Sequence, residues 1–237
     1  MKPHTVRSYD DELIHLDRLI ARMGGLTEAH LGQACDALFH RDPQLATRTM
    51  RADELVDALQ REIEAQVINI IAKRQPVALD LRQIMAALRI ANDLERIGDL
   101  AKNIAKRAYA VSGEIHPQPV ISGLRNMLEM TLAQLKDVLD AYAQRDTAKA
   151  LKVWHDDENI DAMYNSLFRE MLTYMMEDPR NISVCTHLLF GAKNLERIGD
   201  HTTNVAENVN YVVTGEMLDD DRPKVDDTST TMLSPDD

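Results

Sequence analysis

The hexapeptide LERIGD occurs twice in this chain of 237 residues, at 94–99 and at 195–200. The flanking residues align too, ANDLERIGDLAKNIA at 91–105 with AKNLERIGDHTTNVA at 192–206. Identical hexapeptides in matching surroundings indicate that one structural unit has been duplicated.

A second match lies upstream of each hexapeptide. HRDPQLATRTMRADELVDA at 40–58 aligns with QRDTAKALKVWHDDENIDA at 144–162, with an offset of 104 residues instead of 101. A loop can absorb the difference of three residues. The sequence therefore predicts two repeats with separate boundaries. We place them at 1–113 and 116–215, followed by a tail at 216–237.

The repeats are predicted to be helical. Prolines separate long stretches with apolar residues at helical spacing, and proline inside a helix removes a hydrogen bond and clashes with the preceding turn. Leu94, Ile97, Ala101 and Ile104 follow the alternating spacing of a bundle seam. The expected helices cover residues 8–40, 43–74, 79–111, 118–144, 147–177 and 181–213. The predicted fold is all-α, with two tandem antiparallel three-helix bundles.

Composition narrows the class of protein. The net charge of −12 argues against nucleic acid as a partner, since phosphate backbones need clustered Lys and Arg. No apolar run is long enough to cross a membrane, and no secretion signal is visible, so we expect a cytoplasmic location. Cys35 and Cys185 are expected to be small core residues. The tail at 216–237 carries eight acids and two bases, half of the net charge, and we expect it to be disordered.

Acidic residues recur in pairs four positions apart, and such neighbours share one face of a helix. Like charges at this spacing destabilise a helix by about 0.2–0.5 kcal/mol per pair, yet both repeats contain two of them. The four pairs are Asp53/Asp57, Glu95/Asp99, Asp157/Asp161 and Glu196/Asp200.

These carboxylates are candidate metal ligands. Taking Leu94 and Ile97 as the seam, we expect the acids on the outside of each bundle or in the groove between two helices. Asn103 and Asn204 extend the two columns with amide oxygens. Hard oxygen ligands are typical of Mg²⁺, Mn²⁺, Ca²⁺ or iron sites. A bound cation would convert unfavourable like-charge pairs into ligand sets.

Other interpretations remain open at this point. Acids on an outward helical face are usually solvated, and Arg61 is placed to pair with Asp57. A metal-storage or di-iron oxidoreductase bundle needs inward Glu-x-x-His motifs, and only Glu12–His15 has that spacing. A purely structural adaptor would bind no metal. Gly98 and Gly199 lie beside the seam, where we expect them to permit close helix packing.

The chain resembles the PhoU family of phosphate-specific transport system accessory proteins. The resemblance rests on both LERIGD copies, IAKRQP and DLR within 71–82, MGG at 23–25 and LTYMMEDPR at 172–180, and it covers about residues 8–215. It implies two similar three-helix bundles whose surfaces carry metal-binding [ED]-x-x-x-D motifs. The motifs in this chain are the four acidic pairs. The metal implied is a divalent ion or iron, with Mg, Mn, Fe and Zn all open.

The resemblance also implies a function without catalysis. The family represses phosphate uptake and the phosphate-starvation response, and is thought to link the ATPase subunit of the phosphate ABC transporter to a sensor histidine kinase. We expect a homodimer that neither binds nucleic acid nor inserts into a membrane. Asn194 stands where the first repeat has Asp93, and Lys193 where it has Asn92. We therefore expect the second site to bind metal less tightly or with a different number of ions.

Overall fold

The computed structural model describes residues 3–218 and is all-α in that range. Side chains are described from Ser8 onward. The elements are α1 (Pro3–His40), α2 (Pro43–Arg74), α3 (Ala78–Ala110), α4 (Gln118–Gln144), α5 (Thr147–Asp156), α6 (Glu158–Glu177), the 3₁₀ helix η1 (Pro179–Asn181) and α7 (Ile182–Thr214). The predicted all-α class is confirmed. The expected tail at 216–237 lies almost wholly outside the described residues.

The same tight turn starts the second helix of each repeat. Arg41 and Arg145 adopt left-handed backbone conformations, with φ of 54° and 55°. The next residue caps the following helix. Asp42 accepts hydrogen bonds from the N–H groups of Gln44 and Leu45, and the Asp146 carboxylate accepts one from Lys149. Such caps satisfy N–H groups that have no partner inside a helix.

The helix expected over 147–177 is divided at Asp157, which separates α5 from α6. The Asp157 carbonyl accepts a hydrogen bond from the Ile160 N–H, three residues ahead, at 2.9 Å. This spacing is that of a 3₁₀ turn, which winds more tightly than the α-helix on either side. The corresponding residue of the first repeat, Asp53, lies inside the unbroken α2.

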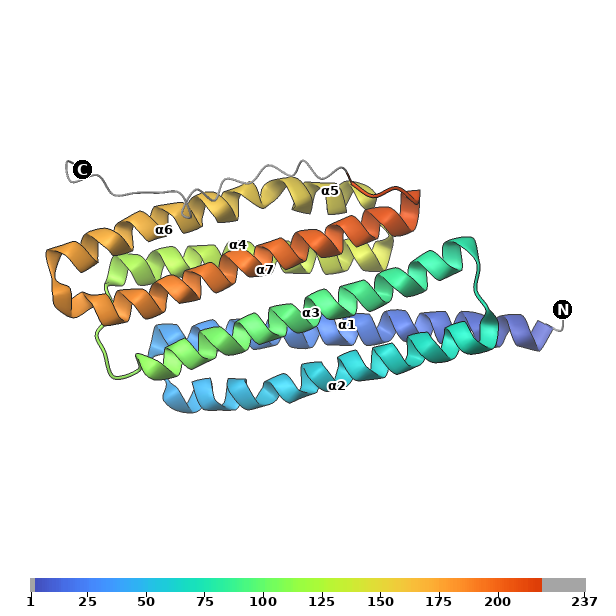
Figure 1. Cartoon of the computed structure of the whole chain (residues 1–237), viewed down its shortest axis with the longest axis horizontal. Coiled ribbons are helices and arrows are strands. Elements are labelled where there is room, and N and C mark those ends of the chain that lie inside the picture. The colour runs from blue at the N-terminus through green and yellow to red at the C-terminus, as the bar shows by residue number, and fades with distance from the viewer. Residues whose placement is uncertain (1–2, 219–237) are drawn as a thin grey trace.

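Two trios of helices lie side by side, as Figure 1 shows. In the first, α1, α2 and α3 pack against one another, and in the second α4 and the α5–α6 pair pack against α7. The trios join through α1 against α4 and α3 against α7. These four helices therefore form the centre, while α2 and α5–α6 lie on opposite outer sides. Within the described residues, no helix has the length and apolarity that crossing a membrane requires.

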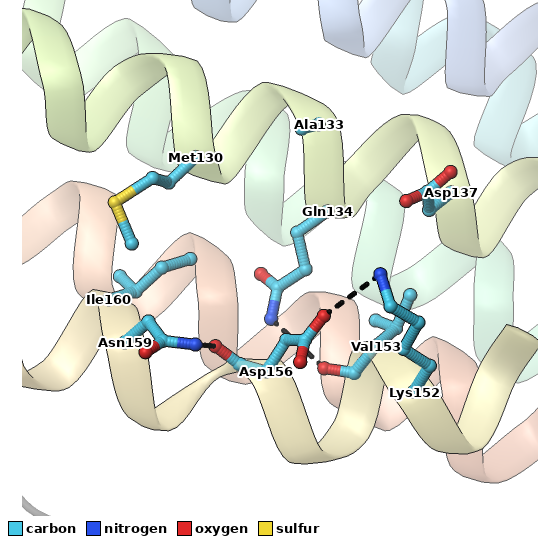
Figure 2. A pocket seen from close by; sticks show the side chains of 9 residues that line it. All are labelled: Met130, Ala133, Gln134, Asp137, Lys152, Val153, Asp156, Asn159 and Ile160. Carbon is cyan, nitrogen blue, oxygen red and sulfur yellow. Dashed lines mark hydrogen bonds and ion pairs between the residues drawn. The ribbon is translucent and has the colours of Figure 1, made fainter.

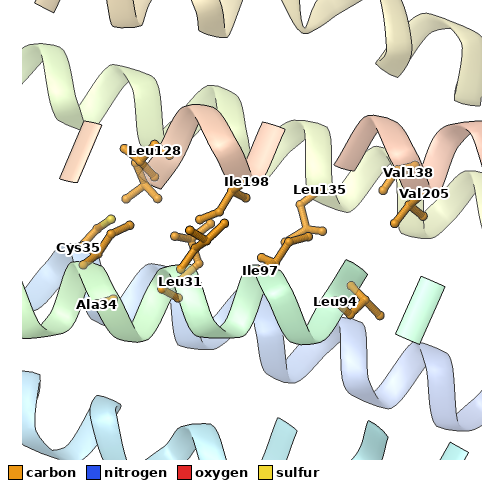
Figure 3. Packing of buried hydrophobic residues seen from close by; sticks show 14 of the residues in the cluster. Leu31, Ala34, Cys35, Leu94, Ile97, Leu128, Leu135, Val138, Ile198 and Val205 are labelled. Carbon is orange, nitrogen blue, oxygen red and sulfur yellow. The ribbon is translucent and has the colours of Figure 1, made fainter. Parts of the chain in front are cut away.

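One continuous apolar core runs through both trios. Leu31 of α1 and Ile97 of α3 point toward Leu135 of α4 and Ile198 of α7, as Figure 3 shows. All four side chains are fully buried. Cys35 and Cys185 are buried in the same core, as expected. The junction between the repeats is thus a packed interior.

Replacing Ile97 by alanine tests the shared core. We expect Ile97→Ala to lower the free energy of unfolding by about 2–5 kcal/mol, because it leaves a cavity between the trios. The matched control is Ile68→Ala on α2, where the side chain is 67% exposed; we expect a change below about 0.5 kcal/mol. Urea unfolding followed by circular dichroism measures both. Equal losses would contradict this description of the core.

Candidate functional site

The acidic pairs gather into two clusters, one in each trio. The first acidic cluster comprises Asp53 and Asp57 of α2 with Glu95 and Asp99 of α3, and the second comprises Asp157 and Asp161 with Glu196 and Asp200 of α7. Asp53, Asp157, Asp161 and Glu196 are at most 5% exposed. The expectation of an outer face is therefore wrong for these four, and the alternative, a groove between two helices, is right.

Two glycines bring the helices of each groove close together. A Cβ atom on Gly98 would lie 3.2 Å from Val56 Cγ1 and 3.4 Å from Asp53 Oδ1. One on Gly199 would lie 2.5 Å from Asp157 Oδ1. The expected packing role of these glycines is confirmed. A glycine inside a helix destabilises it by about 1 kcal/mol relative to alanine. At Gly98 and Gly199 the absence of a Cβ leaves room for the carboxylates of Asp53 and Asp157.

Lys102 of α3 neutralises the most buried acid of the first acidic cluster. Its Nζ lies 2.6 Å from Asp53 Oδ2. This hydrogen bond is the main reason that the pKa of Lys102 is raised, and the charges of Asp99 and Asp57 add to it. Arg96 lies at the rim, 3.4 Å from Glu95 and 3.5 Å from Asp99. Because Arg96 is mostly exposed, these outer ion pairs contribute little to stability.

His30 of α1 reaches the inner side of the first acidic cluster. Its Nε2 lies 2.8 Å from the Thr49 carbonyl oxygen, and its Nδ1 lies 3.8 Å from Asp53 Oδ1. Burial lowers the pKa of His30, which favours the neutral ring. With Nε2 donating to the carbonyl, Nδ1 of the neutral ring is an acceptor that faces the carboxylate. Nδ1 is buried and has no hydrogen-bond partner among the described residues.

The second acidic cluster has a different set of partners. Gln134 of α4 donates from Nε2 to Asp157 Oδ1 at 2.9 Å. Lys193 of α7 lies 2.9 Å from Glu196 Oε1, and its ammonium is 4.9 Å from the centre of the Tyr164 ring. The other oxygen of Glu196 is buried without a hydrogen-bond partner in the described part of the chain.

Gln134 also lines a pocket of about 270 Å³ between α4 and the α5–α6 pair. Figure 2 shows its side chain extending from α4 toward the Val153 carbonyl, which its Nε2 approaches to 3.4 Å. Asp137, Lys152 and Asp156 line the rim. The pocket therefore gives an opening of mixed charge beside the second acidic cluster.

The first helices of the two repeats place polar side chains at matching positions. With the offset of 104, Gln134 corresponds to His30 and Val153 to Thr49. Both side chains contact the equivalent backbone carbonyl and lie beside the equivalent aspartate. Sequence reasoning missed these residues, although extending the offset of 104 back into the first helix would have paired them.

Burial shifts the protonation of the acids on α3 and α7. Desolvation raises the pKa of Glu196 to about 7, with further increases from Asp200 and Asp161, while Lys193 opposes the shift. Desolvation also raises the pKa of Glu95, which Arg96 lowers and Asp99, Asp57 and Asp53 raise further. Within each cluster the carboxylates are therefore close enough to influence one another.

One expected ligand, Asn204, lies elsewhere. Asn204 donates to Asp93 Oδ1 at 3.2 Å, and His201 Nδ1 lies 3.0 Å from the same oxygen. These contacts tie α3 to α7 across the junction of the repeats, so Asn204 does not extend the acidic column as expected. Among the described residues, no three His, Cys, Asp or Glu side chains converge closely enough to form a ready metal site. The role of the eight acids as metal ligands therefore stays a prediction.

A family model described as "PhoU domain" matches this chain twice, at residues 20–108 and 124–209. The chain belongs to the PhoU family. A curated relative, the "Phosphate-specific transport system accessory protein PhoU homolog" of Rhizobium meliloti, is 52% identical over 96% of each chain. The Caulobacter vibrioides protein of the same name is 50% identical over 95% of this chain and 98% of its own.

Solved PhoU structures share the fold. PhoU from Pseudomonas aeruginosa is 36% identical and superposes with a TM-score of 0.84, over 88% of this chain and 100% of its own. The phosphate transport system regulatory protein PhoU from Streptococcus pneumoniae is 29% identical, with a TM-score of 0.82 over 89% and 99%. The expected tandem three-helix architecture fits this PhoU fold. As an accessory protein family, PhoU places the chain in phosphate transport regulation.

Alanine at Gly199 tests the close helix contact. Its Cβ would lie 2.5 Å from Asp157 Oδ1 and would push this carboxylate from its hydrogen bond with Gln134. We expect Gly199→Ala to destabilise the protein by about 1–3 kcal/mol, as overpacking does. Gly32→Ala is the matched control, since a Cβ there meets nothing within 4 Å; it should stabilise the helix by about 1 kcal/mol. Thermal unfolding compares the two, and shifts of the same sign would contradict the contact.

The raised pKa of Glu196 predicts how stability depends on pH. The folded state holds the proton up to about pH 7, and the unfolded state releases it near 4.5, so stability falls as pH rises between these values. At about 1.4 kcal/mol per pKa unit the loss reaches about 3 kcal/mol. Glu196→Gln should remove this slope, whereas the exposed Glu158→Gln should keep it. Denaturant unfolding from pH 4.5 to 7.5 with chelator measures it; parallel wild-type and Glu196→Gln curves would refute the prediction.

Proposed function

We propose that the protein is a non-enzymatic negative regulator of phosphate uptake and phosphate-starvation signalling that binds metal ions at its two acidic clusters. The names of the relatives, which are accessory and regulatory proteins of phosphate transport, support the regulatory role. The observation that carries the metal role is the gathering of eight carboxylates into two helix grooves, one in each repeat. Placing like charges together under cover of a second helix is unfavourable without a cation.

Several features of the grooves fit a cation. The carboxylates offer hard oxygen ligands, which suit Mg²⁺, Mn²⁺ or iron, and His30 Nδ1 is an additional buried acceptor beside Asp53. Glu196 has a buried oxygen with no hydrogen-bond partner in the described range. Gly199 leaves no room for a Cβ beside Asp157. When bound, the metal would supply local positive charge. The ligands would be Asp53, Asp57, Glu95 and Asp99 in one cluster, and Asp157, Asp161, Glu196 and Asp200 in the other.

The partners that we propose are the ATPase subunit of the phosphate ABC transporter, a sensor histidine kinase and a second copy of this chain. A divalent ion would reverse the local charge of a groove, and charge complementarity determines which protein surfaces are accepted. The metal could therefore decide which partner binds. The proposed location is the cytoplasm.

The alternative of a metal-storage or di-iron oxidoreductase bundle gains no support from the described residues. Its only Glu-x-x-His acid, Glu12, is held by Arg74 at 2.7 Å. The acidic clusters lie in grooves between neighbouring helices, whereas the centre of the protein is the apolar core. This arrangement favours a regulator over a redox centre.

The decisive experiment removes the carboxylates that α3 and α7 contribute to the two acidic clusters. The variant Glu95→Gln, Asp99→Asn, Glu196→Gln, Asp200→Asn should lose most of the metal found by elemental analysis of protein purified without chelator. It should also fail to repress phosphate-starvation genes in cells and to retain the transporter ATPase in a pull-down. A control variant changes exposed acids outside the clusters, Glu129→Gln and Glu158→Gln. Unchanged metal content and repression in the first variant would refute the proposal.

A further inference from the structure

Each acidic cluster contains a lysine, and the two lysines come from positions that are not equivalent in the repeats. Lys102 binds Asp53 in the first cluster and Lys193 binds Glu196 in the second. With the offset of 101, Lys102 corresponds to Thr203 and Lys193 to Asn92. The duplicated carboxylates are thus compensated by ammonium groups that the duplication itself did not provide. A positive charge that compensates the buried carboxylate is thus supplied from a different position in each groove.

The side chains of the two lysines are more exposed than those of the acids they neutralise. The side chains of Lys102 and Lys193 are 32% and 34% exposed, whereas those of Asp53 and Glu196 are 2% and 6% exposed. A lysine carries its charge on a flexible four-carbon stem, and its tip can turn to water without disturbing the helix. The buried carboxylates cannot follow, and an uncompensated buried charge is costly. Another cation, or a proton taken up by the carboxylate, must therefore replace a departing ammonium.

We propose that Lys102 and Lys193 are tethered counter-ions that occupy the cation positions of the two acidic clusters in the metal-free protein and swing out when a divalent cation binds. This inference rests on the metal binding of the proposed function and adds a mechanism of competition. To bind, the metal must be attracted to the carboxylates more strongly than the lysine ammonium, which is always present at the site.

Two buried acceptors show that the ammonium groups leave ligand capacity unused. His30 Nδ1 faces Asp53 Oδ1 at 3.8 Å, and Glu196 Oε2 belongs to the carboxylate that Lys193 holds by its other oxygen. Neither atom has a hydrogen-bond partner among the described residues, and both side chains are more than nine-tenths buried. A metal ion, which needs several lone pairs, can use acceptors that the ammonium group leaves over.

The competition also predicts selectivity. A monovalent ion would only replace the ammonium charge for charge and gain little from the exchange. A divalent ion adds one unit of positive charge to the groove, and the attraction to the carboxylates grows in proportion. The tethered lysine therefore sets a threshold that favours Mn²⁺ or Mg²⁺ over Na⁺ or K⁺.

Exchanging residues between the repeats tests the proposal with substitutions that each repeat already tolerates. Lys193→Asn removes the ammonium from the second acidic cluster, and Asn92→Lys adds one to the first at an exposed position. Titration of chelator-treated full-length protein with Mn²⁺, with free ion measured by electron paramagnetic resonance, reads the affinity. We expect tightening of about tenfold in the first variant and weakening of about tenfold in the second. Lys136→Asn, an exposed lysine of α4, is the control.

Chemical labelling tests the displacement directly. Lys102 and Lys193 should acylate slowly in the metal-free protein, because their ammonium groups are held by carboxylates. Saturating Mn²⁺ should release both side chains and speed their acylation several-fold, as read by mass spectrometry of peptides. Lys136 should react at the same rate with and without Mn²⁺.

The outcomes separate the two proposals. If both exchange variants are folded but bind Mn²⁺ like the wild type, or if Mn²⁺ does not change the labelling of Lys102 and Lys193, the counter-ions are refuted and the metal sites stand. If the wild type binds no Mn²⁺, or the variant without the α3 and α7 carboxylates binds it equally well, the metal sites and the counter-ions are both refuted. Circular dichroism of each variant establishes that it is folded.

Discussion

Burying like charges under a second helix is the constraint on which this structure depends. Asp53 and Asp157 lie against the backbone of the neighbouring helix at Gly98 and Gly199, where there is little water to solvate them. A carboxylate in such a place is tolerated only with a hydrogen bond or a cation at hand. Gln134 from the first helix of the second repeat and one lysine in each groove meet this requirement.

The helices that carry the acids also join the repeats. α3 presents Glu95 and Asp99 to the first groove and Asp93 to His201 and Asn204 of α7. α7 in turn presents Glu196 and Asp200 to the second groove. Each groove therefore includes a helix, α3 or α7, that also forms the junction between the repeats. The charged groups of a groove and the packing at the junction thus lie on the same helix. A change in either acidic cluster can therefore act on the contact between α3 and α7.

The repeated hexapeptide and the apolar spacing of Leu94 and Ile97 were enough to predict the helices and their order. The burial of the acids was not predictable in the same way. A helical wheel built on the seam of Leu195 and Ile198 assigns Glu196 to the outside, but α7 contacts more than one helix, and a second neighbour covers positions beside the seam. The roles of Lys102 and Lys193 were not predictable for another reason. Comparison of the repeats finds only the residues that they share, and neither lysine has a lysine at the equivalent position. The helix is divided at Asp157, whose carbonyl accepts from the Ile160 N–H three residues ahead, whereas α2 runs unbroken through the matching Asp53.

The continuous core has a consequence for the independence of the halves. Both trios are needed to cover the core residues Leu31, Ile97, Leu135 and Ile198. A fragment ending after α3 would therefore expose a broad apolar surface to water. Exposed apolar areas of that kind drive association. Because the halves descend from one unit, a severed half would find its best cover in another half, and fragments would pair or precipitate. A single trio could meet the same need by pairing with a second copy, and the duplicated chain holds that pairing within one polypeptide.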